Sequence, residues 1–220
     1  MDGGRISQDW IMRPKVKTTP DLSATSEAHH EARRQGDAHF RLWERNVRDH
    51  FKGLSEEEIK VILAQTSFPF AVCFEHWIGD FNIGSGIRNA NAFGAREVFY
   101  IGDKKWDRRS AVGTYNYTNV QWLPTIDDLI KLQERYVIVG IDNVPGSVSI
   151  HHYRWPHNTL MVFGEEGVGL TPAMQSFCRD IVEIPMYGSV RSLNCGVASG
   201  IVMYDYTEKY HNKMNDLGHL

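Results

Sequence analysis

The sequence of 220 residues contains few cysteines, no long apolar run and little net charge. Its cysteines, Cys73, Cys178 and Cys195, are odd in number and far apart, which is typical of reduced core thiols rather than a disulfide framework. No stretch approaches the ~20 apolar residues that cross a bilayer, and the N-terminus lacks the apolar segment of a signal peptide. We therefore expect a cytoplasmic protein with no membrane partner.

Motifs for metals and for nucleoside triphosphates are also missing. The ten histidines form no H-E-x-x-H pattern, and the cysteines form no C-x-x-C pair, so we expect no metal site. There is no Gly-Lys-Ser/Thr phosphate loop, which argues against nucleotide hydrolysis. The net charge of −3 provides no general attraction to nucleic acid, so any RNA contact must use local basic groups.

What is present is an average globular composition, with 42% hydrophobic and 23% charged residues, in a chain long enough for one core and an extension. From residue 68, short apolar runs alternate with helical or loop stretches. This alternation predicts an α/β fold with a mostly parallel sheet and helices on both faces. The expected strands are FPFAVCFE, EVFYIG, YVIVGID, TLMVFGE and IVEIPM, and the expected helices span 84–93, 126–135, 172–179 and 193–213.

The first 66 residues have a different pattern, and we expect them to form an N-terminal extension to a domain of residues 67–220. The first 25 or so residues are polar and read as a flexible arm. An amphipathic helix with a basic side is predicted from about Glu27 to Phe51. A second helix is predicted to start at the capping box formed by Ser55 and Glu58.

Three segments at strand ends carry more glycine and polar residues than turns require. In the first, Asn82–Gly94, Gly84-x-Gly86 is similar to a dinucleotide-binding turn, although Asn89 replaces the third glycine. The second, Phe163–Pro172, contains two adjacent carboxylates. The third, Ile184–Gly200, passes from a loop into a helix rich in small residues.

Together these segments resemble the three motifs of the SpoU (TrmH-like) class of SPOUT RNA methyltransferases. Asn82, Arg88 and Phe93-Gly94 are similar to the first motif, and Gly164-x-Glu166-x-x-Gly169-Leu170 is similar to the second. The third motif corresponds to Ile184-Pro185-Met186, Gly188 and Ser192-Leu193-Asn194. Cys195-Gly196 stands where the family commonly has Val-Ser. The resemblance extends from about residue 68 to 208.

The resemblance implies a C-terminal trefoil knot that forms the pocket for S-adenosylmethionine, within a SPOUT methyltransferase domain of residues 67–220. It also implies methyl transfer to a ribose 2′-hydroxyl of transfer or ribosomal RNA. The candidate catalytic residues are Arg88, Asn82, Glu166, Ser192 and Asn194, with Arg88 stabilising the developing alkoxide because guanidinium keeps its proton. The candidate cofactor-binding residues are Gly164, Ile184, Met186 and Leu193.

The family is generally homodimeric, and we expect residues 194–200 with Met203, Tyr204 and Tyr206 to supply close packing between protomers. For RNA, a basic loop with an aromatic side chain and the basic N-terminal helix are the candidate contacts. They comprise Lys104, Lys105, Trp106, Arg108, Arg109, Arg41 and Arg45.

Two alternatives remain at this stage. A Rossmann-type dinucleotide-binding enzyme would use Gly84-x-Gly86. A non-catalytic RNA-binding or ribonucleoprotein assembly protein would keep the fold and lose methyl transfer.

Overall fold

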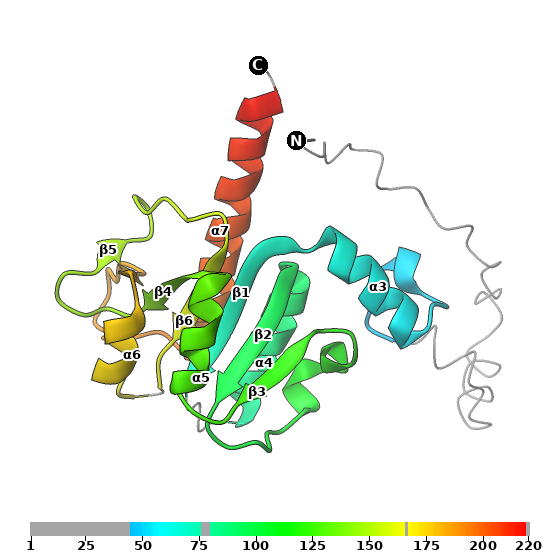
Figure 1. The fold of residues 1–220 in the computed structure, drawn as a ribbon, viewed down its shortest axis with the longest axis horizontal. Helices are drawn as coiled ribbons and strands as arrows, with labels where there is room; N and C mark the ends of the chain where they lie inside the picture. The colour runs from blue at the N-terminus through cyan, green and yellow to red at the C-terminus, as the bar shows by residue number, and fades with distance from the viewer. Residues whose placement is uncertain (1–44, 76–79, 166, 219–220) are drawn as a thin grey trace. The chain divides into compact units, whose positions relative to one another are not determined.

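The computed structural model describes residues 45–75, 80–165 and 167–218, which divide between two compact units, Met1–Ile59 and Lys60–Leu220. Figure 1 shows the fold. Within the described residues, no helix is both long enough and apolar enough to cross a membrane.

In the first unit, the predicted basic helix does not continue to Phe51. Residues up to 44 of that prediction lie outside the described part of the chain. Residues 45–47 form bends, Arg48 is extended (φ −60°, ψ 151°), and only the short 3-10 helix η2 (Asp49–Phe51) follows. The Arg45 guanidinium donates a hydrogen bond to the Leu54 carbonyl, so this segment turns back on itself instead of extending as a helix.

The capping box is confirmed at the start of α3 (Glu56–Thr66), the helix that spans the boundary between the units. The Ser55 backbone N–H donates to Glu58 Oε2 at 2.7 Å, and the Glu58 N–H donates to Ser55 Oγ at 3.2 Å. These reciprocal bonds satisfy two helix-terminal donors.

The second unit is built on a seven-stranded sheet in the order β3-β2-β1-β6-β4-β7-β5. Every pair of neighbouring strands is parallel, as the alternation of strands and helices predicts. The strands are β1 (Phe68–Glu75), β2 (Ala95–Ile101), β3 (Val120–Leu123), β4 (Val137–Ile141), β5 (Val148–Ser149), β6 (Thr159–Phe163) and β7 (Asp180–Glu183).

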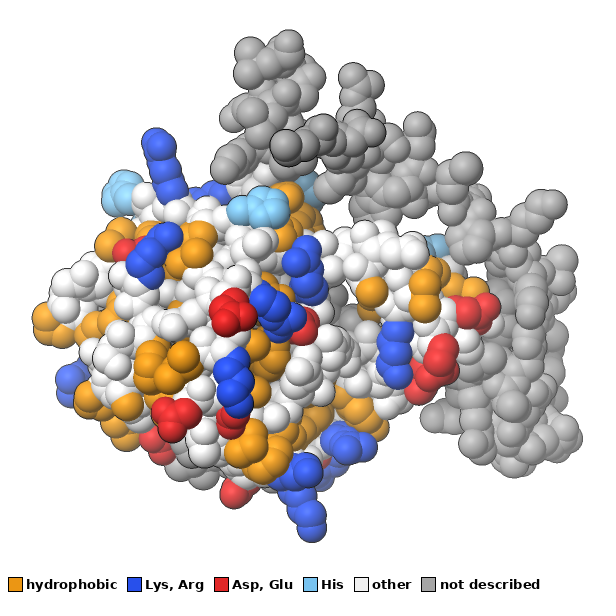
Figure 2. All heavy atoms as spheres, in the orientation of Figure 1, with side chains coloured by type: hydrophobic (Ala, Val, Ile, Leu, Met, Phe, Trp, Pro, Cys, Tyr) orange, Lys and Arg blue, Asp and Glu red, His pale blue; other side chains and the backbone are white. Residues whose placement is uncertain are grey.

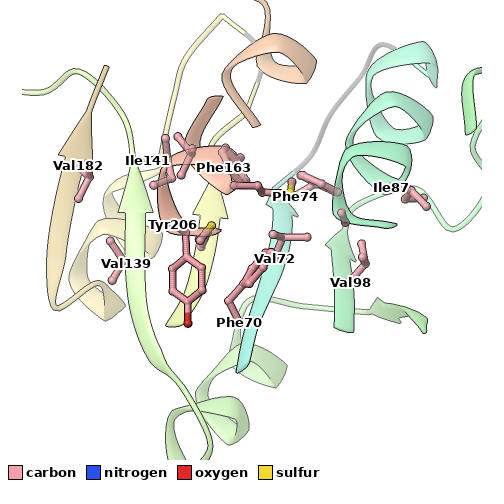
Figure 3. Packing of buried hydrophobic residues seen from close by; sticks show 14 of the residues in the cluster. Phe70, Val72, Phe74, Ile87, Val98, Val139, Ile141, Phe163, Val182 and Tyr206 are labelled. Carbon is pink, nitrogen blue, oxygen red and sulfur yellow. The ribbon is translucent and has the colours of Figure 1, made fainter. Parts of the chain in front are cut away.

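Helices cover both faces of the sheet, as predicted. On β1, the side chains of Phe70, Val72 and Phe74 lie on one face, and those of Ala71 and Cys73 lie on the other. The first face packs against α4 (Asp80–Ala92) and α7 (Cys195–Gly218). The second packs against α5 (Asp127–Ile130), the 3-10 helix η5 (Lys131–Glu134) and α6 (Pro172–Phe177). Figure 3 shows Tyr206 of α7 beside the β1 and β4 side chains.

Some elements differ from the prediction. The strands β3 and β5 were not expected, because they are short and lie at the two edges of the sheet, where side chains are only partly buried and give no apolar run. The helix predicted over 126–135 is divided into α5 and η5. Two short 3-10 helices, η3 (Arg109–Ala111) and η4 (Thr114–Asn116), precede β3.

The helix α7 corrects part of the expected dimer surface. Met203 and Tyr206 are fully buried in the core of their own chain, so they are not available to a second protomer. Among the α7 side chains that the structure describes, those of Val197, Ile201 and Tyr204 are large, apolar and exposed. Their spacing of four and three residues places them on one side of the helix.

Candidate functional site

A pocket of about 850 Å³ lies beyond the carboxyl ends of β4, β6 and β7. This is where open parallel sheets bind ligands, and the volume is within the range of small-molecule sites. The pocket is lined by Asn82, Ile141, Asp142, Asn143, Phe163, Gly164, Glu165, Gly167, Val168, Gly169, Ile184, Met186, Arg191, Ser192, Leu193, Asn194, Cys195 and Ala198.

The pocket brings together residues from all three sequence segments. Of the predicted site residues, the first segment supplies Asn82 and the second supplies Gly164. The third segment supplies the largest share, namely Ile184, Met186, Ser192, Leu193 and Asn194. Side chains separated by more than 100 positions in the sequence therefore meet in one wall.

The predicted catalytic residue Arg88 is not among the described residues that line the pocket. Arg88 is exposed on α4 and forms no hydrogen bond or ion pair with another described residue. It follows Asn82 by six residues on the same helix, a spacing that turns its side chain to a different side. Glu166 lies outside the described residues.

Asn194 links the first and third segments. Its Nδ2 donates to Asn82 Oδ1 at 3.0 Å, and its Oδ1 accepts from the Val197 backbone N–H at 3.2 Å. The second bond is that of a helix N-cap, so Asn194 also fixes the start of α7. One amide therefore holds the pocket wall to both α4 and α7.

The second segment forms a tight loop over the pocket. Glu165 and Gly169 exchange backbone hydrogen bonds at 2.9 and 2.8 Å, and Gly169 has the positive φ of 83° that favours glycine. A Cβ on Gly164 would lie 2.2 Å from the backbone of Gly169 and Leu170. Glycine at position 164 is therefore required for the two arms of this loop to pack against each other, and both arms line the pocket.

Sequence reasoning missed the wall formed by the end of β4. Asp142 accepts a hydrogen bond from the Leu170 N–H at 2.7 Å and lies at the position where a Gly169 side chain would have to be. The neighbouring Asn143 donates to the Arg191 carbonyl. The run YVIVGID could have predicted this wall, because its final Asp142 directly follows a parallel strand. Polar residues in that position lie at the edge of the sheet where ligands bind.

The glycines of the first segment do not form a dinucleotide-binding turn. The helix α4 begins at Asp80, so Gly84 and Gly86 lie inside it rather than in the turn before it. A Cβ on Gly84 would be 2.0 Å from Ser110 Oγ, and one on Gly86 would be 2.5 Å from the Phe74 ring. Both glycines serve close helix packing, which removes the feature that favoured a Rossmann-type enzyme.

Most of the predicted RNA-contact residues lie in the loop that follows β2. Lys104 and Lys105 are exposed, and the Lys104 ammonium lies 5.0 Å from the Trp122 ring centre. Trp106 is half-buried, with its ring edge-on to Tyr115, and is less available for stacking on a base than its sequence suggests. The candidate cations Arg108 and Arg109 contact Tyr115 and Asp107, respectively. Arg45 donates to its own segment, and Arg41 lies outside the described residues.

Figure 2 shows Lys and Arg side chains interspersed with Asp and Glu on the face in view. The basic side chains on this face therefore do not form one continuous positive area, in agreement with the small net charge of the chain. Among the described residues, no group of three or more His, Cys, Asp or Glu side chains is arranged to hold a metal ion.

The parallel sheet and the pocket beyond its strand ends define an α/β domain of the kind that binds a cofactor. Residues 69–204 match the SpoU rRNA Methylase family. The chain belongs to this family.

Named relatives agree with this assignment. The chain is 29% identical over 161 residues to the 23S rRNA (guanosine-2′-O-)-methyltransferase RlmB of Vibrio vulnificus, covering 70% of this chain and 65% of the relative. It is 27% identical to the mouse tRNA (guanosine(18)-2′-O)-methyltransferase TARBP1, over 58% of this chain and 9% of that protein. The chain thus spans just under two thirds of the first relative's length.

Solved structures share the fold. The SpoU methyltransferase AviRb from Streptomyces viridochromogenes, solved in complex with the cofactor AdoMet, aligns with a TM-score of 0.60 and 28% identity, covering 64% of this chain and 57% of that one. The TrmH/SpoU tRNA modifying enzyme of A. aeolicus aligns with a TM-score of 0.65 and 21% identity, over 72% and 83% of the two chains.

Proposed function

We propose that this protein transfers a methyl group from S-adenosylmethionine to a ribose 2′-hydroxyl of transfer or ribosomal RNA. The observation that carries the proposal is the convergence of the three sequence segments on one pocket, held by the hydrogen bond between Asn194 and Asn82. The guanosine 2′-O-methyltransferase relatives and the AdoMet complex of AviRb support the same reaction.

The pocket residues fit S-adenosylmethionine. Ile184, Met186 and Leu193 offer apolar contacts to a nucleobase, and the glycines of the second segment line the pocket with main chain instead of side chains, so a bent ligand can approach the backbone there. Asp142 also lines the pocket, and its carboxylate can accept further hydrogen bonds from hydroxyl or amino groups of such a ligand. When bound there, the cofactor supplies an electrophilic methyl group on a sulfonium, and the chain supplies orientation and exclusion of water.

The remaining chemistry is the transfer of a proton from the weakly acidic 2′-hydroxyl to water or to a phosphate oxygen of the RNA. Ser192 and Asn82 lie in the pocket wall and would position the ribose by hydrogen bonds. Arg88 would stabilise the negative charge that develops on the oxygen, because its guanidinium stays protonated. Glu166 is proposed to fix its loop or Arg88.

We infer that the protein is a homodimer in which Arg88 serves the pocket of the second protomer. Arg88 does not line its own pocket, and the exposed side chains of Val197, Ile201 and Tyr204 form an apolar stripe on α7. The helix α7 packs on α4, with Asn89 donating to the Gly196 carbonyl at 2.8 Å. A second copy seated on this stripe would therefore lie close to the helix that carries Arg88.

Other parts of the proposal come from the family resemblance. The C-terminal trefoil knot is one, and the hydrogen bond from Asn143 to the Arg191 carbonyl supports it, because it joins the loop after β4 to the loop after β7. The role of residues 1–66 as an extension with RNA contact and the cytoplasmic location also stay predictions.

The test is incorporation of radiolabelled methyl groups from S-adenosylmethionine into unmodified tRNA and rRNA transcripts. Ribose methylation blocks alkaline cleavage at the modified position, so the label is expected in alkali-resistant dinucleotides. Label in single nucleotides would indicate a base acceptor. No label, with RNA binding intact, would support the non-catalytic RNA-binding alternative.

A further inference from the structure

We propose that a second pocket, at the opposite end of the sheet, binds a phosphate group of the RNA backbone. The inference rests on the proposed function for the identity of the ligand. The pocket has a volume of about 690 Å³ and lies where β2 and β3 begin. It is lined by Lys60, Leu63, Ala64, Thr66, Ser67, Asn91, Gly94, Ala95, Arg96, Glu97, Tyr117, Thr118, Asn119, Val120 and Arg135.

The charge of this pocket favours an anion. Three cationic side chains line it, those of Lys60, Arg96 and Arg135, against the single carboxylate of Glu97. That carboxylate is 7% exposed and already engaged within the protein, because it accepts from Tyr136 Oη at 2.6 Å and pairs with Arg135 at 2.9 Å. With Glu97 and Arg135 paired to each other, the Arg96 guanidinium in the same pocket is the cation that can face a ligand.

Two groups in the pocket have hydrogen-bond donors that no described residue uses. Arg96 is exposed and forms no hydrogen bond or ion pair with any other described residue. The Ser67 hydroxyl is buried from solvent and has no hydrogen-bond partner in the described part of the chain. A buried hydroxyl without a partner costs free energy unless a ligand or water satisfies it. A guanidinium and a hydroxyl in one cavity are suited to phosphate oxygens.

The position of the pocket favours a phosphate within RNA over a free nucleotide. A strand as long as β2, with seven residues, separates the two ends of the sheet by about 20 Å. A structured RNA is large enough to contact both ends at once, and phosphate contacts of this kind fix the register of the nucleic acid. Because the net charge of the chain is −3, local cation clusters must supply the electrostatic attraction.

The experiment measures RNA affinity of the full-length chain by fluorescence anisotropy with labelled bulk tRNA over a series of salt concentrations. In the double variant Lys60→Gln with Arg96→Gln, we expect the Kd to rise about 5- to 10-fold and the salt slope to fall by about one to two. The matched control is Arg154→Gln, because Arg154 is also exposed but does not line this pocket. Double-variant affinity and slope equal to those of the control would overturn the inference.

A second variant, Ser67→Ala, tests the site without altering charge. Its melting temperature should not fall, because the hydroxyl has no partner to lose among the described residues, whereas its RNA affinity should fall about 2- to 3-fold. Unchanged RNA affinity in this variant would contradict the contact. A titration with GMP distinguishes the sources of phosphate. The RNA assignment would be overturned if the wild-type protein bound GMP and the double variant did not, while the double variant kept the RNA affinity of the wild type.

These results are separable from the proposed function. If the wild-type protein transfers no methyl groups and the double variant still loses RNA affinity, the proposed function fails and the phosphate site stands. If the wild-type protein methylates RNA and the double variant binds RNA as the control does, the phosphate site fails alone. Affinity for S-adenosylmethionine should be the same in all these variants.

Discussion

Asn194 shows how one side chain can serve both stability and function at the scale of single residues. Its amide oxygen caps α7 and its amide nitrogen holds Asn82. A cap is worth about 1 kcal/mol. The sequence alone suggested a hydrogen-bonding role for this residue, but it could not show the pairing with Asn82, because the two residues are 112 positions apart in the chain.

Two substitutions at Asn194 separate the cap from the link. Asn194→Ala should lower the free energy of unfolding by about 1–2 kcal/mol, because both bonds are lost. Asn194→Asp keeps an oxygen for the cap and loses the donor to Asn82, so its stability loss should be smaller. Both should weaken binding of S-adenosylmethionine. Denaturant unfolding and calorimetry measure the two effects, and an Ala variant as stable as the wild type would rule out the cap.

The three cysteines should differ in reactivity. Burial raises the pKa of the Cys178 thiol to about 12 and also raises the pKa of the Cys73 thiol. Both therefore stay protonated at pH 8 and become thiolates only as the pH nears these raised values. Cys195 lines the pocket. When the protein is treated with iodoacetamide at pH 8, mass spectrometry should show that Cys195 is alkylated before the other two cysteines. Bound S-adenosylhomocysteine should slow the alkylation of Cys195. Faster alkylation of Cys178 than of Cys195 would contradict this prediction.

At the scale of elements, the close packing of α4 depends on glycine. Gly86 lies against the Phe74 ring of β1, and a Cβ on Gly196 of α7 would lie only 3.2 Å from the Cβ of Ser85. These contacts explain why glycine recurs inside predicted helices where it lowers intrinsic helix stability. The similarity of Gly84-x-Gly86 to a dinucleotide-binding turn was misleading because close helix packing and a turn can both require glycine.

The substitution Gly86→Ala should destabilise the protein by about 1–3 kcal/mol, because the new Cβ would lie 2.5 Å from the buried Phe74 ring. Gly188→Ala is the matched control, because a Cβ there would meet nothing within 4 Å and Gly188 has no positive φ. Thermal or urea unfolding of the two variants measures the difference. Equal stability would show that α4 can move away from β1 without cost.

Much of the element pattern was predictable because buried parallel strands read as continuous apolar runs. All five predicted runs correspond to strands, and β1 matches FPFAVCFE residue for residue. The helix α6 begins after Thr171, as its Thr-Pro pair indicates, with Met174 N–H donating to Thr171 Oγ1. Edge strands such as β3 bury too few side chains to give that signal.

At the scale of the whole molecule, the sequence motifs located the pocket residues but did not show that Arg88 lies apart from them. Asn82, Ser192 and Asn194 meet in one wall, whereas Arg88 lies apart from it. Neither spacing nor composition predicts this, because the side of α4 that faces the pocket depends on how the helix packs on β1 and α7. The homodimer proposal follows from that separation.

Mixing two variants tests whether Arg88 acts across the proposed dimer, in an assay with S-adenosylmethionine at a concentration where each variant alone is inactive. If Arg88→Ala and Asn194→Ala are co-refolded in equal amounts, half of the dimers are mixed, and each mixed dimer has one site with both residues intact. Methyl transfer should then recover to about a quarter of the wild-type rate. No recovery, with mixed dimers demonstrated by native mass spectrometry, would place Arg88 in the site of its own chain.

The central claim is that loops after β4, β6 and β7 form one pocket with Asn82 and bind S-adenosylmethionine. Isothermal titration calorimetry of the wild-type chain with S-adenosylmethionine tests it most directly. The account predicts saturable binding with one site per chain, lost or strongly weakened when Leu193 is changed to Asp in the pocket wall. Absence of binding by the folded wild-type protein, or full binding by Leu193→Asp, would contradict it.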